Sequence, residues 1–276
     1  MGELISSMKN LTDSLIETDQ ICEKHGTKLL ELMGHTACFE CQREKKEKTE
    51  EETRRLYMMD WELQHFEDSR RKTYWRLAYD SIFADNTLKK ADFSSFHADN
   101  EELTENKKKA LEIAERYKNN EVFNSLLTGS AGTGKSHLAM SILQKVNEES
   151  DPYRSCLFLS IDEFLLGIRS TFRPGSQDDE KAVVDKYAKV DLLVLDDLGA
   201  ETGFIGTDKV ASDFTQRILY HLMNRRQDKS TIITTNLNSK QISAMYDSKV
   251  VSRLYKNLGG NIIKFEKSKD RRIVEF

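Results

Sequence analysis

Proline is scarce in this chain, with two residues among 276. Both, Pro152 and Pro174, lie in the second half, so residues 42–120 are free to be largely helical. Long apolar runs are missing as well, because no stretch approaches the ~20 apolar residues that a membrane helix needs. The first 20 residues are interrupted by charged side chains and lack the apolar core of a signal peptide. These absences predict a cytoplasmic protein.

Neither sign of charge dominates, since the chain has 42 Lys and Arg residues and 46 Asp and Glu residues. This balance excludes a protein coated in basic surface, so any contact with nucleic acid must come from a local patch. Residues 253–272 form one candidate patch, with seven basic and two acidic side chains. A solvated surface explains this stretch equally well. The length suits one sizeable α/β core and a small accessory module.

Cysteine is rare too, and four cysteines in a cytosolic chain favour a metal or free thiols over a disulfide scaffold. Cys22-x-x-His25 and Cys38-x-x-Cys41 are two close pairs separated by a loop, the arrangement that tetrahedral zinc favours. We therefore expect these four residues to bind a structural zinc ion, which leaves no open position for catalysis. Free thiols are the alternative reading, and His35 is the alternative to His25.

Charged residues of both signs alternate over residues 42–55 at helical spacing, which predicts an exposed helical connector. An apolar stripe follows on one face of the same helix: Leu56, Met59, Leu63 and Phe66. This stripe packs either on a partner helix or on the protein's own domain. The apolar spacing of residues 105–118 predicts a further amphipathic helix.

From residue 122 onward, short apolar runs alternate with helical patterns. One expected helix starts at residue 134, and two others cover 162–172 and 211–226. The expected strands cover 122–128, 155–160, 190–196, 231–235 and 262–266. Five apolar strands separated by helices predict an α/β fold with a parallel five-stranded sheet and helices on both faces. Cys156, inside one of these strands, is expected to be a small buried hydrophobe.

A glycine-rich loop joins the first of these strands to a helix. Its sequence is Gly129-Ser-Ala-Gly-Thr-Gly-Lys135-Ser136, a G-x-x-x-x-G-K-S pattern whose backbone N–H groups cradle phosphates at a helix N-terminus. Lys135 would neutralise the β- and γ-phosphates of ATP, and Ser136 would ligate magnesium. The predicted nucleotide-binding residues are Gly129, Ser130, Ala131, Gly132, Thr133, Gly134, Lys135, Ser136 and His137.

Two later strands end in polar side chains suited to the same site. The strand at 190–196 ends in Asp196 and Asp197, which we expect to bind magnesium and to polarise the attacking water, respectively. The strand at 231–235 is followed by Asn236, whose amide is placed to reach the γ-phosphate and position water. Together with Lys135, these residues are the predicted catalytic set of an ATPase.

These motifs resemble those of AAA+ ATPases, with Walker A at 129–136, Walker B at 191–197 and sensor 1 at Asn236. More narrowly, two segments resemble the DnaC/DnaI helicase loaders and the IstB transposition ATPases. Their sequences are Asp-Leu-Leu-Val-Leu-Asp-Asp-Leu-Gly-Ala-Glu and, later in the chain, Thr-Ile-Ile-Thr-Thr-Asn. The resemblance implies self-association through the ATP site, with Arg253 as the arginine that acts on the neighbouring subunit. An ordinary helix-surface arginine is the alternative.

The chain departs from the AAA+ pattern in two places. Asp197 stands where most members have glutamate, and the shorter acid implies slow hydrolysis that DNA or a partner stimulates. Only 40 residues follow Asn236, too few for a full helical lid, so Arg271 or Arg272 would have to serve as sensor 2. The segment 160–172, which presents Arg169 and Phe172 near its end, corresponds to the region that lines the DNA path in loaders. A core-packed helix explains its apolar residues equally well: Phe164, Leu165 and Ile168.

The expected organisation has three parts: a zinc-binding, helicase-interacting module at 1–45, a helical linker at 46–90 and an AAA+ domain without a full lid at 91–276. The resemblance implies an ATP-dependent loader that binds the hexameric replicative helicase and deposits it on single-stranded DNA. ATP, Mg²⁺ and Zn²⁺ are the implied cofactors. The alternatives are an IstB-like ATPase that binds DNA and a transposase, and a competitor that binds the helicase without loading it.

Overall fold

The computed structural model describes residues 16–171, 177–202 and 210–271. Contacts between residues divide the chain into two units, Met1–Asp68 and Ser69–Phe276. Helix α2, Phe39–Asp80, contributes residues to both units, and the expected boundary at residue 45 falls inside it. The separate roles expected for segments 1–45, 46–90 and 91–276 stay a prediction.

The N-terminal unit contains a small antiparallel sheet that the sequence pattern did not reveal. Its strands lie in the order β1 (Ile16–Ile21), β2 (Lys28–Leu32) and β3 (His35–Ala37). A two-residue turn joins β2 to β3, and both of its residues, Met33 and Gly34, have positive φ angles of 51° and 81°. Positive φ at both positions matches the twist of the flanking strands, which explains the tight hairpin.

Helix α2 is continuous because no proline interrupts it and its charges pair along the helix surface. Arg43 contacts Glu40 and Glu47, at 2.6 and 3.7 Å, one helical turn to either side. The expected exposed connector at 42–55 therefore forms part of this helix. No core of the described N-terminal unit covers the apolar stripe, since its four residues are each more than half exposed: Leu56, Met59, Leu63 and Phe66. Packing on a partner helix stays a prediction.

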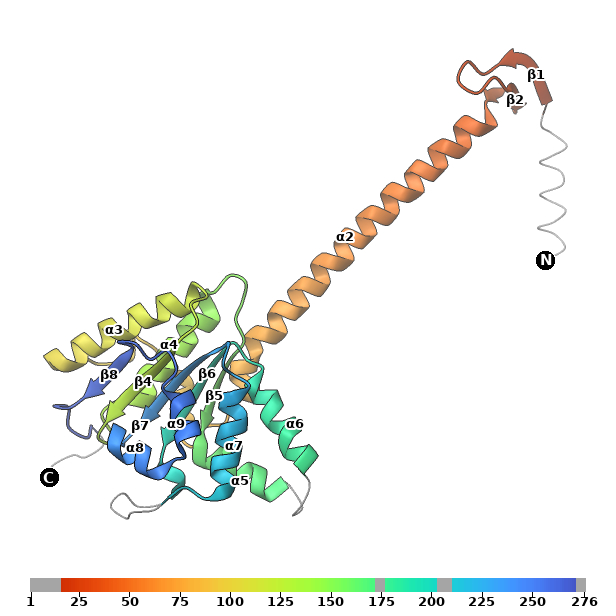
Figure 1. The fold of residues 1–276 in the computed structure, drawn as a ribbon. Helices are drawn as coiled ribbons and strands as arrows, with labels where there is room; N and C mark the ends of the chain where they lie inside the picture. The colour runs from red at the N-terminus through yellow and green to blue at the C-terminus, as the bar shows by residue number, and fades with distance from the viewer. Residues whose placement is uncertain (1–15, 172–176, 203–209, 272–276) are drawn as a thin grey trace. The chain divides into compact units, whose positions relative to one another are not determined.

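The C-terminal unit is built on a parallel sheet of five strands, as predicted (Figure 1). The strands lie in the order β5, β6, β7, β4, β8, and every neighbouring pair is parallel. The expected bounds agree with the observed ones to within two residues. The strands are β4 (Asn124–Gly129), β5 (Cys156–Ser160), β6 (Leu192–Leu198), β7 (Ser230–Thr235) and β8 (Ile262–Phe265).

Helices cover both faces of this sheet, which confirms the predicted fold class (Figure 1). One face carries the C-terminal end of α2 with α3 (Glu101–Lys118) and α4 (Lys135–Glu149). The other face carries α5 (Ile161–Thr171), α6 (Gln177–Ala188), α7 (Asp213–Asn224), α8 (Ser239–Met245) and α9 (Ser248–Leu254). Two short 3₁₀ turns, η1 (Asn86–Lys90) and η2 (Ala200–Thr202), complete the unit.

Strand β6 shows how the sheet divides the core in two. Leu192 and Val194 belong to the cluster under α3 and α4, whereas Leu193 and Leu195 belong to the cluster under α5 to α9. Alternate residues of a strand point to opposite faces, so a strand covered on both sides carries apolar residues on both of them. This double burial is the reason that β6 was recognisable as a continuous apolar run.

The register of the strands determines which side chains meet at the carboxyl edge of the sheet. Thr128 of β4 lies beside Thr235 of β7, and Leu195 of β6 lies beside Ile233 of β7. Because the strands are parallel, the residues that follow them converge at one edge. The loop after β4, the acids that end β6 and the residue after β7 therefore lie together.

Candidate functional site

The glycine-rich loop lies between β4 and α4, as the motif requires. Gly129 closes β4 with a φ of 145°, and a side chain there would meet the backbone oxygen of Phe265 on β8 at 2.3 Å. Gly134 precedes the first turn of α4 with a φ of 102°, in the left-handed region that favours glycine. Glycine at these two positions lets the loop wrap over the start of α4, whose first N–H groups form an anion-binding end.

A cavity of about 510 Å³ opens against this loop. Its volume falls in the range of about 300 to 1,000 Å³ that small-molecule and cofactor sites occupy. The predicted residues among its lining are Ala131, Gly132, Gly134, Lys135, Ser136, His137, Asp196, Asp197 and Asn236. The fold thus brings together one cation, two acids and an amide from three different strand ends.

Lys135 connects the loop to the end of β7. Its Nζ donates to the backbone oxygen of Ser130 at 2.6 Å and to Oδ1 of Asn236 at 2.7 Å. Asn236 in turn donates from Nδ2 to Oδ1 of Asp197 at 2.8 Å. The ammonium group of Lys135, the amide of Asn236 and the carboxylate of Asp197 therefore form a chain of hydrogen bonds at the cavity. Phosphate groups and a water molecule can form hydrogen bonds with these groups.

Asp196 is almost completely buried, with 6% of its surface exposed. It accepts hydrogen bonds from the hydroxyl groups of Thr234, at 2.6 Å, and of Ser136. Burial raises the pKa of Asp196 above its ordinary value, because the charged form loses its hydration. A divalent cation at this point would restore a favourable environment for the carboxylate. Ser136 and Asp196 thus have the oxygen ligands and the proximity that Mg²⁺ requires.

Asp197 sits in an unusual backbone conformation, with a φ of 58°. The left-handed region is open to aspartate more readily than to most residues with a Cβ atom. Here it turns the chain after β6, so that the side chain meets Asn236 while the N–H donates to Oγ1 of Thr234 at 2.8 Å. The two neighbouring acids therefore take different partners, which separates their chemical roles.

Thr234 is a site residue that the sequence pattern did not indicate. Its hydroxyl group donates to the carboxylate of Asp196 and accepts from the N–H of Asp197, so one side chain orients both acids. Thr234 is itself fully buried in β7. Its position in a β-branched strand concealed this role, because threonine there is explained by strand propensity alone.

Substituting Thr234 with valine is expected to impair the acids while preserving the shape of the strand. Asp196 would lose a buried donor, at a cost of about 1 to 3 kcal/mol. We expect Mg²⁺-dependent ATP binding to need a higher Mg²⁺ concentration, measured by nucleotide titration at several Mg²⁺ levels. Thr231→Val removes a buried hydroxyl group from the same strand that contacts Arg226 instead. Equal Mg²⁺ dependence in both variants would contradict the role of Thr234.

One wall of the cavity comes from a segment that precedes α3 and that carried no recognisable motif. The lining residues of this wall are Ala84, Asp85, Leu88, Ser95, Phe96 and His97. His137 on α4 fastens the segment, with Nε2 lying 3.1 Å from the backbone oxygen of Asp92 and 3.2 Å from Oγ of Ser95. Burial lowers the pKa of His137, because the charged form of the ring loses its hydration. This predicted nucleotide-binding residue thus lies at the cavity and shapes its wall.

The loop after Asp197 is anchored by Glu201. Its Oε2 accepts from the N–H of Gly199 at 2.9 Å, and its Oε1 accepts from the hydroxyl group of Tyr246. Burial raises the pKa of both Glu201 and Tyr246. Tyr246 lies at the end of α8, so this contact links the acidic edge of the site to the helices that follow β7.

Arg253 lies away from the cavity, at the opposite edge of the sheet. Its backbone oxygen accepts from Nδ2 of Asn124, the first residue of β4, whereas the glycine-rich loop follows the last residue of that strand. The guanidinium group donates to Oδ1 of Asn224 at 3.0 Å and lies over the ring of Tyr220. Arg253 therefore cannot reach the nucleotide cavity of its own chain.

The expectations for the C-terminal residues and for α5 have mixed outcomes. Arg271 lines the cavity and donates to the backbone oxygen of His97, whereas Arg272 lies outside the described residues. Phe172 also lies outside them. The apolar residues of α5 pack in the core, as the core-packed alternative holds: Phe164, Leu165 and Ile168. Arg169 near the end of α5 lies over the ring of Phe214.

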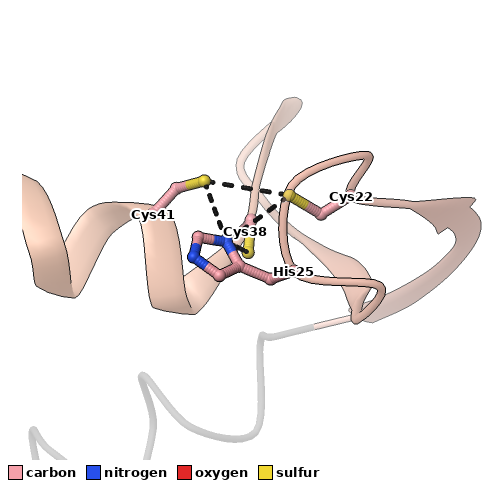
Figure 2. Close-up of side chains that lie close together, drawn as sticks. All are labelled: Cys22, His25, Cys38 and Cys41. Atoms are coloured by element: carbon pink, nitrogen blue, oxygen red, sulfur yellow. Dashed lines mark hydrogen bonds between the residues drawn. The ribbon is translucent and has the colours of Figure 1, made fainter.

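The four predicted zinc ligands converge in the N-terminal unit. Figure 2 shows the His25 ring and the three cysteine sulfurs pointing toward one another. Their ligand atoms lie within 4.8 Å of one another, and this cluster includes His25 rather than the alternative, His35, which lies exposed in β3. Cys156 is fully buried in β5, as predicted for a small hydrophobe.

The cluster has the dimensions of a tetrahedral zinc site. Zinc bonds of about 2.3 Å to sulfur and 2.0 to 2.1 Å to nitrogen give tetrahedral edges of about 3.8 Å between sulfurs and 3.6 Å between sulfur and nitrogen. The sulfurs of Cys22 and Cys41 lie 3.8 Å apart. Nδ1 of His25 lies 3.3, 3.6 and 3.7 Å from the sulfurs of Cys41, Cys38 and Cys22. Three soft thiolates and one imidazole are a donor set that suits zinc.

A comparison with protein families agrees with the geometry of the ATP site. The model of the IstB-like ATP binding protein family matches residues 27–256. The chain belongs to this family. The match includes the glycine-rich loop, both acids, Asn236 and Arg253. Membership confirms the resemblance to IstB-like proteins that the motifs indicated.

Curated relatives of this IstB-like chain include replicative helicase loaders. The replicative helicase loader DnaC of Escherichia coli K12 is 27% identical over 148 residues, which are 53% of this chain and 55% of DnaC. DnaC of Buchnera aphidicola from Acyrthosiphon pisum is 25% identical over 174 residues, which are 61% of this chain and 65% of that protein. The chain thus spans about half to two thirds of the length of the curated relatives it matches.

Solved structures show the same fold in this IstB-like chain. A primosome component assigned to Streptococcus pyogenes serotype M3 superposes with a TM-score of 0.52 at 18% identity, covering 69% of this chain and 93% of that chain. AMPPCP-bound DnaA from Aquifex aeolicus superposes with a TM-score of 0.51 at 22% identity, covering 69% and 54%. The C-terminal unit has the AAA+ fold. Among the described residues, no helix is long and apolar enough to cross a membrane.

Proposed function

We propose that this chain is an ATP-dependent loader that binds the hexameric replicative helicase and deposits it on single-stranded DNA during replication initiation. The observation that carries the proposal is that relatives matching half of the chain or more are named replicative helicase loaders. The joining of a Cys₃His cluster to an IstB-like ATP site supports it further. In this proposal the N-terminal module binds the helicase and the AAA+ unit responds to ATP.

At the ATP site, we assign the roles by charge and position. Lys135 neutralises the β- and γ-phosphates, and the N–H groups of the loop at 129–136 hold their oxygens. Ser136 and Asp196 hold Mg²⁺, which when bound neutralises the developing negative charge on the phosphates. Asp197 polarises the attacking water, and Asn236, which already contacts Asp197, positions it.

We propose that hydrolysis is slow until DNA or a partner stimulates it. Asp197 has a shorter side chain than the glutamate of most AAA+ proteins, and its carboxylate accepts a hydrogen bond from Asn236. A γ-phosphate would compete with Asn236 for the ammonium group of Lys135, so nucleotide binding and the position of Asn236 are coupled. Such a site suits ATP-controlled assembly better than rapid turnover.

Self-association would complete the site with a residue of a neighbouring subunit. Arg253 lies at the edge of the sheet opposite to the cavity and is partly exposed near the end of α9. An arginine placed there cannot act within its own chain, but it can stabilise phosphate charge across a subunit interface. We therefore propose Arg253 as the arginine that acts on the neighbouring subunit.

For single-stranded DNA, we propose contacts from the exposed basic residues of the C-terminal segment. The exposed lysines of this segment support phosphate contact: Lys256, Lys264, Lys267 and Lys269. On α5, Arg169 is exposed, so we propose it as a further phosphate contact.

The proposal predicts that the purified chain binds the replicative helicase of the same genome and loads it. A pull-down with and without ATP tests binding, and helicase transfer onto circular single-stranded DNA tests loading. We expect Lys135→Ala to keep helicase binding, because the N-terminal module is unchanged, and to lose loading. Failure to bind any replicative helicase under either condition would contradict the proposal. Loading that persists in Lys135→Ala would contradict the role of ATP.

An IstB-like transposition ATPase is the second candidate, and the family description favours it. Its partners would be duplex DNA and a transposase. Assembly into filaments on duplex DNA, without association with a helicase, would select this function. A competitor that binds the helicase without loading it is the third candidate, and ATP-dependent loading by the wild-type chain would exclude it.

A further inference from the structure

Beyond the four ligands of the zinc cluster, a fifth residue contacts this centre. Glu44 lies on α2, three residues after Cys41 and six after Cys38, and its Oε1 is 3.1 Å from Nε2 of His25. We propose that Glu44 is a positioning residue that holds His25 in the tautomer and ring orientation needed to bind zinc. This inference rests on the proposed zinc site and assigns the residue that orients its only imidazole ligand.

The two nitrogen atoms of His25 face different partners. Nδ1 points at the three cysteine sulfurs, at 3.3 to 3.7 Å, whereas Nε2 points at Glu44. A neutral imidazole carries one proton, and a metal binds the nitrogen that lacks it. Zinc on Nδ1 therefore requires the proton on Nε2, where the carboxylate of Glu44 accepts it in a hydrogen bond. This is the arrangement in which a carboxylate orients a metal-binding histidine.

Glu44 is held in place from a second direction. Its other oxygen, Oε2, forms an ion pair with Nζ of Lys24, the residue directly before His25. Two adjacent residues of the turn at 22–27 thus contact the two oxygens of one carboxylate on α2. The side chains of Lys24 and Glu44 are 62% and 40% exposed, so their ion pair alone contributes little stability. The side chain of His25 is 18% exposed, which leaves the bond from Nε2 better shielded from water.

The position of Glu44 follows from the helical repeat. Cys38 directly precedes α2, and Cys41 lies in its first turn. Glu44 follows three residues after Cys41, and residues three apart are neighbours on a helix surface. The turn at 22–27 contacts both positions, because His25 lies near the sulfur of Cys41 and the carboxylate of Glu44. Sequence spacing alone did not single out Glu44, because it belongs to a mixed-charge run in which acids recur at helical spacing.

Removing Glu44 should loosen the zinc ligand while leaving the ligand set intact. Loss of such an outer partner lowers metal affinity by about 10- to 100-fold. We therefore expect Glu44→Ala to bind one zinc ion per chain with an affinity lower by that factor. Glu44→Gln keeps an acceptor oxygen for Nε2 and should recover most of the loss. Glu47→Ala, which removes a nearby acid that contacts Arg43 instead of His25, should stay within about threefold of the wild type.

The experiment uses the full-length chain and measures zinc affinity by competition with a chromophoric chelator. Cobalt(II) absorption provides a second readout, because its ligand-field bands report the geometry of the nitrogen ligand while its thiolate charge-transfer bands report the three cysteines. We expect Glu44→Ala to alter the ligand-field bands and keep the charge-transfer bands. Glutamine at 44 should restore the wild-type spectrum.

The outcomes separate this inference from the zinc site itself. A wild-type chain that binds no zinc would overturn both. A wild-type chain that binds zinc, with Glu44→Ala of equal affinity and unchanged cobalt spectrum, would overturn the role of Glu44 alone. Equal losses in Glu44→Ala and Glu47→Ala would also overturn it, since they would indicate a general effect of charge. If Glu44→Ala failed to fold, wild-type affinity in Glu44→Gln would support the inference and a full loss in that variant would oppose it.

Discussion

Alanine in place of Lys135 is expected to weaken ATP binding by about 10- to 100-fold, the effect of losing a charge-assisted hydrogen bond of about 1.5 to 3 kcal/mol. Hydrolysis should fall further, by about 100- to 1,000-fold, because the ammonium group stabilises charge that develops on the phosphates. Lys135 is buried at the start of α4, with 6% of its surface exposed, and its ammonium group contacts Asn236 in the cavity. No other cation among the described residues lines the cavity at that position.

The measurement combines titration with a fluorescent ATP analogue and assay of phosphate release. Lys145→Ala is the matched control, because Lys145 lies on the same helix and contacts Glu115 and Glu149 instead of the cavity. We expect this control to bind ATP like the wild type. Wild-type ATP affinity in the Lys135→Ala chain would show that the nucleotide does not use this loop.

The ATPase activity of a mixture of two variant chains tests the role of Arg253. Lys135→Ala and Arg253→Ala chains should each be inactive alone, the first for lack of ATP binding and the second for lack of a contribution to its neighbour. In a mixture, an intact loop can meet an intact arginine across one interface, so part of the ATPase activity should return. No recovery in a mixture that does associate would leave Arg253 as an ordinary surface arginine.

Removal of zinc is expected to unfold the small N-terminal sheet and to leave the ATP site intact. Among the described residues 16–68, Cys38 is the one buried side chain, so strands β1 to β3 have no hydrophobic core that could hold them together. In such a segment the metal supplies the folding free energy, which for zinc-finger peptides is about 10 to 16 kcal/mol. Cys38→Ser should have the same effect as a chelator.

Three measurements test this expectation. Elemental analysis should find one zinc ion per wild-type chain and less in Cys38→Ser. Amide NMR signals of β1 to β3 should lose their dispersion after chelation, while ATP affinity stays unchanged. Cys156→Ala is the control for the loss of a thiol, because Cys156 is buried in β5 and lies outside the cluster. A folded N-terminal sheet after complete removal of zinc would contradict the structural role of the metal.

The candidate sites were predictable from the sequence to different degrees. The glycine-rich loop was recognisable because its backbone needs glycine at Gly129 and Gly134, a local requirement that leaves a local signature. The cavity wall at 84–97 was not, because its residues meet the loop only through contacts such as the one between His137 and Asp92. Thr234 escaped notice for a related reason, since a buried strand explains a threonine without any reference to Asp196.

What the sequence by itself determined was the set of elements with local causes. The parallel strands were recognisable because burial on both faces gives each of them a short run of consecutive apolar or β-branched residues, and the zinc ligands because short spacing places two pairs in turns. The tertiary structure alone decided the choice of His25 over His35, the contact with Glu44, and the position of Arg253 at the far edge of the sheet. These depend on residues that are distant along the chain, and their contacts are determined by packing and register, which no local pattern encodes.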